Sequence, residues 1–147
     1  DYSMKKNIIY IFIIFSIIAI YVTGKVVNFR ESNLQIKRLN KEYEQYLNKE
    51  IYGTDIITII NTAIDNNKKL KIEKNNENNY IDNETTSITI YIKMLDTEEK
   101  YSMEIIDKVG ISSFIDNFNT IKFKSSEVKY HKKTGQIAEI TFEELEN

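Results

Sequence analysis

The chain has 147 residues, and its 20 Lys and Arg against 22 Asp and Glu give a formal net charge of -2. This balance excludes the basic surface typical of nucleic-acid-binding proteins, so we expect no nucleic-acid partner. The sequence contains no Cys, which excludes disulfides, thiolate catalysis and cysteine zinc sites. Beyond an apolar N-terminal stretch, the remaining length suits about one domain.

The apolar stretch is the most informative part of the sequence. From Ile8 to Val22, Ser16 is the only polar side chain that is not aromatic. Residues 8–27 are long enough for a helix to cross the roughly 30 Å of bilayer hydrocarbon. We therefore expect residues 1–27 to form a transmembrane or filament-core helix. The side chains expected to contact lipid or neighbouring helices are Ile8, Ile9, Ile11, Phe12, Ile14, Phe15, Ile18, Tyr21 and Val22.

Three interpretations of this segment remain open. It can be a cleaved signal peptide with Val22-Thr23-Gly24 as the processing site, a retained signal anchor, or a helix that passes from the membrane into a filament. Basic residues flank both ends, with Lys5 and Lys6 before the span and Lys25 after it, so the positive-inside rule does not decide the orientation. The short N-terminal tail favours N-in and C-out. Met4 with the lysines after it resembles an uncut start, which would make residues 1–3 foreign.

An amphipathic pattern continues beyond the span, over residues 28–52. The apolar positions recur at spacings of three and four with a gap at Ser32, and the opposite face is charged. This period predicts one helix from about Lys5 to about Glu50. Its apolar stripe either packs against the following domain or forms a coiled-coil seam with a partner. The residues of the stripe are Phe29, Ile36, Leu39, Tyr43 and Tyr46.

Residues 53–147 predict an α+β domain. Gly53 breaks the long helix, and Thr54 is the expected N-cap of a second helix with an apolar face from Ile56 to Ile64. Asn66 and Asn67 are expected to end that helix. The predicted strands then follow in chain order: one at Ile88–Met94 and one through Tyr101, Met103 and Ile105.

The C-terminal third predicts a short helix, a long strand and a hairpin. Ser112 or Ser113 is the expected cap of a helix that presents Phe114, Ile115 and Phe118. A third strand begins at Ile121, and its apolar parity changes, which predicts a β-bulge near residues 125–126. Lys133-Thr134-Gly135-Gln136 predicts a hairpin turn before a last strand at 137–142. The fold is therefore expected to be a small antiparallel sheet of about four strands, with the long helix and the 56–64 helix covering one face.

Chemistry is sparse in this sequence. His131 is the only histidine, and we expect it to be exposed on a hairpin with no nucleophile and carboxylate to complete a triad. The Asn-rich segment 74–84 is oxygen-rich but lacks the calcium-loop pattern, so a mobile, hydrated loop is expected. We expect no catalytic residue, no metal site and no cofactor.

The layout of a long helix, first apolar and then amphipathic, followed by a small domain with an antiparallel sheet, resembles type IV pilins and pseudopilins. The stretch Tyr52-Gly53-Thr54-Asp55-Ile56-Ile57-Thr58-Ile59-Ile60 is similar to a Gly-x-x-Val-x-x-x-Ile pattern in pilin-like membrane proteins of Gram-positive bacteria. Pilins usually carry glutamate at the fifth mature position, where this chain has Lys5.

This resemblance implies a non-enzymatic structural subunit of a bacterial cell-surface filament or secretion apparatus. Such a subunit assembles with copies of itself through the N-terminal helix, and its domain lies outside the membrane or in an extracellular filament. The alternative is a single-pass membrane-anchored extracytoplasmic protein that acts as a binding or accessory module.

Overall fold

The computed structural model describes the backbone of residues 2–97 and 99–146, and the side chains from Tyr10 onward within these ranges. The chain divides into two compact units, Asp1–Lys37 and Arg38–Asn147. Helix α1 (Tyr2–Glu44) runs through the first unit and into the second without interruption at Gly24. The long N-terminal helix and the α+β fold class are therefore confirmed.

Helix α1 is shorter than predicted, because it ends at Glu44 and not near Glu50. The backbone N–H of Tyr46 donates to the carbonyl of Tyr43 in a tight turn, and Asn48 has a positive φ of 58°. The N–H of Asn48 then donates to the hydroxyl of Ser125 at 2.9 Å. This turn redirects the chain into a strand. Tyr46, the last residue of the predicted apolar stripe, therefore lies beyond the end of the helix.

The second unit contains a five-stranded sheet in the order β1-β4-β5-β2-β3. Its antiparallel pairs are β1 with β4, β4 with β5, and β2 with β3. The central pair β2 with β5 is parallel. The prediction of about four antiparallel strands was thus wrong in two respects: it missed the three-residue edge strand β1, and it missed the parallel pair. The strands are β1 (Glu50–Tyr52), β2 (Thr89–Lys93), β3 (Lys100–Ser102), β4 (Lys122–Tyr130) and β5 (Ile137–Glu144).

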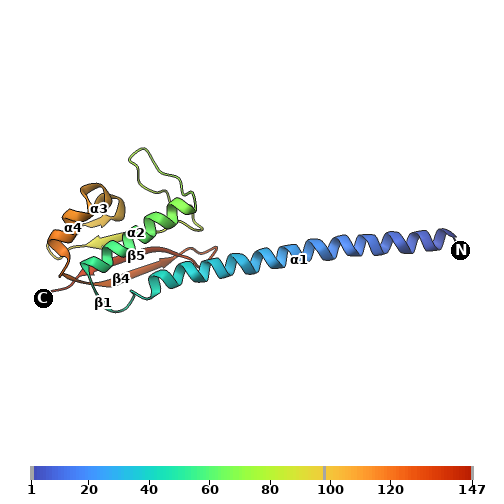
Figure 1. Cartoon of the computed structure of the whole chain (residues 1–147), viewed down its shortest axis with the longest axis horizontal. Helices are drawn as coiled ribbons and strands as arrows, with labels where there is room; N and C mark the ends of the chain where they lie inside the picture. The colour runs from blue at the N-terminus through green and yellow to red at the C-terminus, as the bar shows by residue number, and fades with distance from the viewer. Residues whose placement is uncertain (1, 98, 147) are drawn as a thin grey trace. The chain divides into compact units, whose positions relative to one another are not determined.

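Helix α2 (Gly53–Lys69) lies along one face of the sheet, as Figure 1 shows. Its apolar face was predicted correctly, and its side chains share one core with those of the strands. The predicted packing of the long helix on the sheet is confirmed. Among the described residues of α1, only Tyr43 is fully buried in the core. The largest buried apolar side chains are Phe123, Phe142, Ile56, Ile59, Ile60, Ile88, Ile90, Ile92, Met103, Ile137 and Ile140.

The ends of α2 also differ from the prediction. The side chain of Asp55, not that of Thr54, satisfies the helix start, because its carboxylate accepts the backbone N–H of Tyr52 at 3.0 Å. The helix continues past Asn66 and Asn67, which are both buried. Their side chains make hydrogen bonds inside the domain, so they do not act as helix-ending residues.

Two short helices replace the end of the predicted second strand. The chain leaves β3 at Ser102 and forms α3 (Met103–Val109) and α4 (Ile111–Phe118). Met103 and Ile106 are buried while Ile105 is 46 % exposed, which is a helical and not an alternating pattern. Gly110, with a φ of 110°, caps α4 in place of the predicted serines 112 and 113.

The predicted irregularities of the β4–β5 hairpin are confirmed. Ser125 pairs with Phe142 and Glu127 with Thr141, so the bulge lies at Ser126. The turn contains Gly135 with a φ of 72°, a conformation that glycine adopts without steric cost. The outer face of the sheet is polar, as expected for a sheet with one solvated face. Its ion pairs are Lys93–Glu143, Lys100–Glu127, Lys122–Glu50 and Lys129–Glu139.

Candidate functional site

The apolar segment of α1 is exposed on every side. The seven predicted contact residues whose side chains are described are between 51 % and 70 % exposed. Adjacent residues of a helix, such as Ile11 and Phe12, point in different directions. The exposed apolar side chains therefore do not lie on a single face of the helix. The segment meets the length and composition criteria for a membrane span, and none of it is buried in the chain. The side chains of Ile8 and Ile9 lie outside the described residues.

The two aliphatic hydroxyls in this segment, those of Ser16 and Thr23, make hydrogen bonds within the helix. Ser16 donates to the carbonyl of Phe12 at 2.8 Å, and Thr23 donates to the carbonyl of Ala19. These bonds satisfy both groups without water, as a hydrocarbon environment requires. At the far end, the ammonium of Lys25 lies 5.4 Å from the ring centre of Tyr21. The segment is therefore compatible with a single-pass membrane anchor.

A basic stripe continues along α1 beyond the apolar segment; we use this name for Lys25, Val26, Phe29, Arg30, Asn33, Ile36 and Lys37. Val26, Phe29, Asn33 and Ile36 follow one another at spacings of three and four, so they lie on one helix face. Phe29 is 68 % exposed, and Val26 is also exposed. This part of α1 consequently presents apolar side chains bordered by positive charge.

The α+β domain carries an apolar groove of about 570 Å³ where β3, α3 and α4 meet. Its volume falls in the range of roughly 300–1,000 Å³ common for binding sites. Leu95, Ile105 and Val109 are exposed at this groove. Of the described residues that line it, Asp96 and Glu144 carry charge, and both are acidic. The lining residues are Met94, Leu95, Asp96, Thr97, Tyr101, Ile105, Ile106, Val109, Gly110, Ser113, Phe114, Asn117, Phe118 and Glu144.

This α3–α4 groove was not predicted from the sequence. The alternation of Tyr101, Met103 and Ile105 predicted a strand here, and residues 106–109 were assigned to no element. The helical signal was present in the spacing of Ile105, Ile106 and Val109, which are one, three and four residues apart. The predicted strand places Met103 and Ile105 on one face of a sheet, so it does not predict a groove.

His131 is buried, with 5 % of its surface exposed, so its predicted exposure was wrong. Its Nε2 lies 2.7 Å from the backbone carbonyl of Ser87, and because a carbonyl only accepts, this nitrogen donates. The Ser87 hydroxyl donates to Asp82 at 2.8 Å, and the same carboxylate oxygen lies 3.8 Å from His131 Nδ1. A catalytic triad needs the serine hydroxyl bonded to the histidine. Here the hydroxyl is bonded to the aspartate, so the arrangement is structural.

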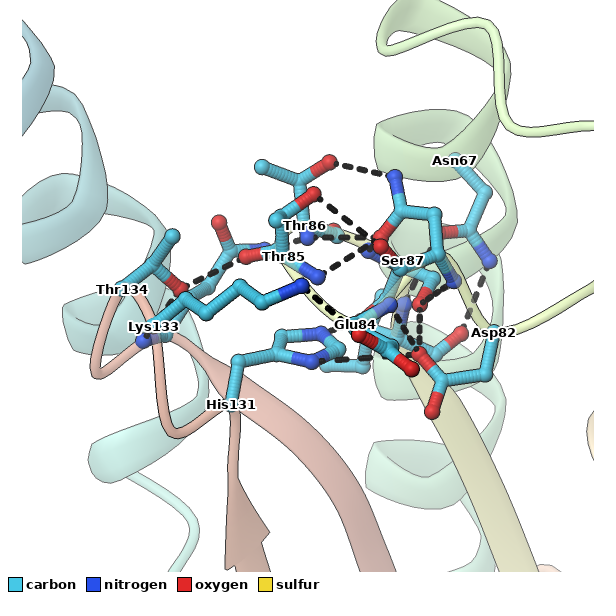
Figure 2. A network of polar contacts seen from close by, with 12 residues as sticks. Asn67, Asp82, Glu84, Thr85, Thr86, Ser87, His131, Lys133 and Thr134 are labelled. Atoms are coloured by element: carbon cyan, nitrogen blue, oxygen red, sulfur yellow. Dashed lines mark hydrogen bonds and ion pairs between the residues drawn. The ribbon is translucent and has the colours of Figure 1, made fainter.

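The polar contacts around His131 join loop 82–87 to the β4–β5 turn, as Figure 2 shows. Lys133 lies 2.7 Å from the Glu84 carboxylate, and the Thr134 hydroxyl donates to the carbonyl of Thr85 at 2.6 Å. The pKa of Asp82 is lowered, first by the hydrogen bond from the backbone N–H of Glu84 and then by that from the Ser87 hydroxyl and by the charge of His131. Partial burial of Asp82 acts in the opposite direction and raises it. The carboxylate is thereby held in its charged form.

A second buried polar contact involves Tyr43. Asn66 donates to its phenolic oxygen at 2.9 Å and to the Glu42 carboxylate at 2.9 Å. Burial raises the pKa of Tyr43, the hydrogen bond from Asn66 opposes this, and the charge of Glu42 adds to it. Within residues 2–97 and 99–146, no group of three or more His, Asp or Glu side chains is placed to hold a metal ion.

Comparison with known proteins gives no relatives: no protein-family model, curated protein or solved structure matches the chain. A functional interpretation therefore depends on the apolar segment of α1, the basic stripe and the α3–α4 groove.

Proposed function

We propose that the chain is a pilin-like or pseudopilin-like structural subunit that inserts into a membrane through α1 and assembles with copies of itself through this helix. The observation that carries the proposal is that apolar side chains are exposed all around residues 10–27 of α1. Such a surface is stable in lipid or among other apolar helices, and water disfavours it by about 25 cal/mol per Å². The function requires no catalytic group.

Two further observations support assembly in addition to anchoring. The hydroxyls of Ser16 and Thr23 are bonded within the helix, so neither is left unsatisfied where the helix packs against lipid or other helices. The basic stripe then continues the apolar surface beyond the span, where a simple anchor has no need for it. In this proposal the N-terminus faces the cytoplasm and the α+β domain lies outside.

Membrane insertion is tested by placing charge in the apolar segment. The double variant Ile14→Arg with Ile18→Arg adds roughly 5–7 kcal/mol to insertion, since each arginine near the helix centre costs about 2.5–3.5 kcal/mol. We expect it to move the protein from the alkali-resistant membrane fraction to the soluble or aggregated fraction. Ile81→Arg, an exposed change in the domain, is the matched control and should remain in the membrane. Unchanged fractionation of the double variant would refute the anchor.

Assembly is tested by shearing cells that express the chain and imaging the released material. Filaments that contain the chain are the expected result. Recovery of the chain only from the membrane, as a monomer or dimer in mild detergent, would contradict the pilin-like function.

The second candidate function is a single-pass membrane-anchored binding or accessory protein. The α3–α4 groove favours it, because an open apolar groove with acidic residues at its edge is a surface that a partner can occupy. This candidate predicts a monomeric or dimeric membrane protein, so the shearing experiment also separates it from the first.

A further inference from the structure

The α3–α4 groove is an apolar surface whose charge has one sign. Leu95, Ile105 and Val109 expose their apolar side chains at it, while Asp96 and Glu144 supply negative charge. The Glu144 carboxylate also accepts the backbone N–H of Leu95 at 3.2 Å, so one of its oxygens already has a partner. The surface that complements this groove is therefore apolar with adjacent basic side chains.

The basic stripe of α1 has this character. Lys25 lies four residues before Phe29, and Lys37 lies four residues after Asn33, so both border the apolar face. Arg30 lies four residues after Val26 on the same side. The only acidic residue between positions 25 and 37 is Glu31, two residues from Phe29 and hence on the opposite side of the helix.

Charge decides which surface can cover the stripe. Two stripes packed against each other would bring the basic residues at positions 25, 30 and 37 of one helix next to those of the other. Like charges facing each other in a helix pair are unfavourable, so the stripe is a poor partner for itself. An apolar surface with acidic neighbours relieves this repulsion, and the α3–α4 groove is such a surface on the same chain.

We propose that the basic stripe of one copy docks into the α3–α4 groove of a second copy, with Phe29 in the groove and Arg30 or Lys37 near Asp96. This inference rests on the proposed function, and it adds a contact outside the membrane to the packing of the apolar segments. The stripe and the groove are different surfaces, so the contact is heterologous when each copy docks its stripe on one neighbour and receives the stripe of another. Repeated contacts of this kind produce a ring or an open filament instead of a closed dimer.

Cysteine cross-linking tests this contact directly, since the natural chain contains no Cys. The chain of residues 1–147 with Phe29→Cys is expressed together with the same chain carrying Val109→Cys and a larger affinity tag. Mild oxidation of the membranes with copper phenanthroline should give a disulfide-linked dimer of mixed size. Glu31→Cys, on the opposite side of the helix, replaces Phe29→Cys in the matched control, and its yield of mixed dimer should be several-fold lower.

Charge reversal then tests the complementarity. Asp96→Arg, an exposed position at the groove, should lower the yield of the Phe29–Val109 cross-link by about fivefold. Arg30→Asp in the other chain should restore it at least in part. A yield that is insensitive to both changes, or equal yields from Phe29→Cys and Glu31→Cys, would overturn the proposal. A dominant symmetrical cross-link between two Phe29→Cys chains would also overturn it, because the stripe would then pair with itself.

Phe15→Cys separates this inference from the proposed function. Cross-linking between two Phe15→Cys chains reports packing of the apolar segments inside the membrane. If it occurs while the Phe29–Val109 cross-link does not, assembly through the span is supported and the stripe-to-groove contact is refuted. If neither cross-link forms, both proposals fail.

Discussion

The side chain of Asn67 forms hydrogen bonds with both backbone polar groups of Ile88. Its Nδ2 donates to the Ile88 carbonyl at 2.7 Å, and its Oδ1 accepts the Ile88 N–H at 3.0 Å. Both residues are fully buried. The side-chain amide of Asn67 thus makes the hydrogen bonds that a neighbouring strand would otherwise make with Ile88, the residue before β2. It thereby fixes where the chain enters the centre of the sheet.

Replacing this amide should be strongly destabilising. Asn67→Leu keeps a similar volume but leaves the N–H and carbonyl of Ile88 buried without their partner, at about 1–3 kcal/mol for each group. We expect the free energy of unfolding to fall by roughly 2–4 kcal/mol, measured by urea titration in mild detergent with tyrosine fluorescence as the probe. Asn61→Leu, on the exposed side of α2, is the control and should change it by less than about 0.5 kcal/mol. Equal effects of the two variants would contradict this role of Asn67.

Gly53 should tolerate no side chain. A Cβ at this position would lie 2.0 Å from the carbonyl oxygen of Phe118, where α4 ends, so the backbone would have to move. Gly53→Ala is expected to cost about 3 kcal/mol or more, or to prevent folding of the domain. Gly24→Ala is the control, since no atom lies within 4 Å of its Cβ, and it should leave stability unchanged. Limited proteolysis of the two variants measures the difference, and equal resistance would show that α4 can shift.

Local patterns were sufficient to predict part of this fold. The change of parity between Phe123 and Val128 predicted the bulge near residues 125–126, and Gly135 predicted the hairpin turn, because each signal lies within a few neighbouring residues. The apolar segment of α1 was equally clear. These features depend on backbone geometry and on the period of the apolar side chains, which a single sequence displays.

The remaining features depend on contacts between distant segments. His131 is buried with its ring hydrogen-bonded to the backbone carbonyl of Ser87, which lies 44 positions away in the sequence. The parallel pairing of β2 with β5 brings Ile90 next to Ile140, although β3, α3, α4 and β4 lie between them in the sequence, and no local pattern specifies it. The groove was missed for a related reason: Met103 and Ile105 fit an alternating period, whereas Met103 and Ile106 are buried and Ile105 is exposed, as in a helix.

Tyr43 should make the domain sensitive to alkaline pH. Burial raises the pKa of Tyr43, so the folded state keeps its proton at a pH where the unfolded state, with a pKa of about 10, loses it. The stability contributed by this group is fully present below about pH 10 and is lost as the pH rises further. Tyr43→Phe should flatten this decline and, by removing the acceptor for Asn66, cost about 1 kcal/mol near neutral pH.

Unfolding free energies measured from about pH 8 to about pH 11 test this prediction. Burial also raises the pKa of Tyr91, so part of the decline should remain in the variant. Tyr10→Phe, in the exposed apolar segment, is the control for removal of a phenol. A decline that is identical in the natural chain and in Tyr43→Phe would show that Tyr43 does not titrate with unfolding.

Asp82 should make the stability of the domain fall at acid pH, whereas Tyr43 makes it fall at alkaline pH. The N–H of Glu84 and the hydroxyl of Ser87 lower the pKa of Asp82, so the folded state binds a proton less readily than the unfolded state, whose pKa is about 3.9. The stabilisation is present above that value and is lost as the pH falls through the lower, folded pKa. Asp82→Asn keeps an oxygen acceptor but removes the charge, so it should reduce the acid-dependent loss of stability.

The expected signature is a convergence of the two proteins at low pH. Near neutral pH the natural chain should be the more stable, because only its carboxylate accepts the Glu84 N–H and the Ser87 hydroxyl as an anion. Urea midpoints measured from about pH 7 down to about pH 2 test this, with Glu146→Gln, an exposed change of the same charge, as the control. Parallel curves for the natural chain and Asp82→Asn would mean that the link between loop 82–87 and the β4–β5 turn depends on geometry and not on charge.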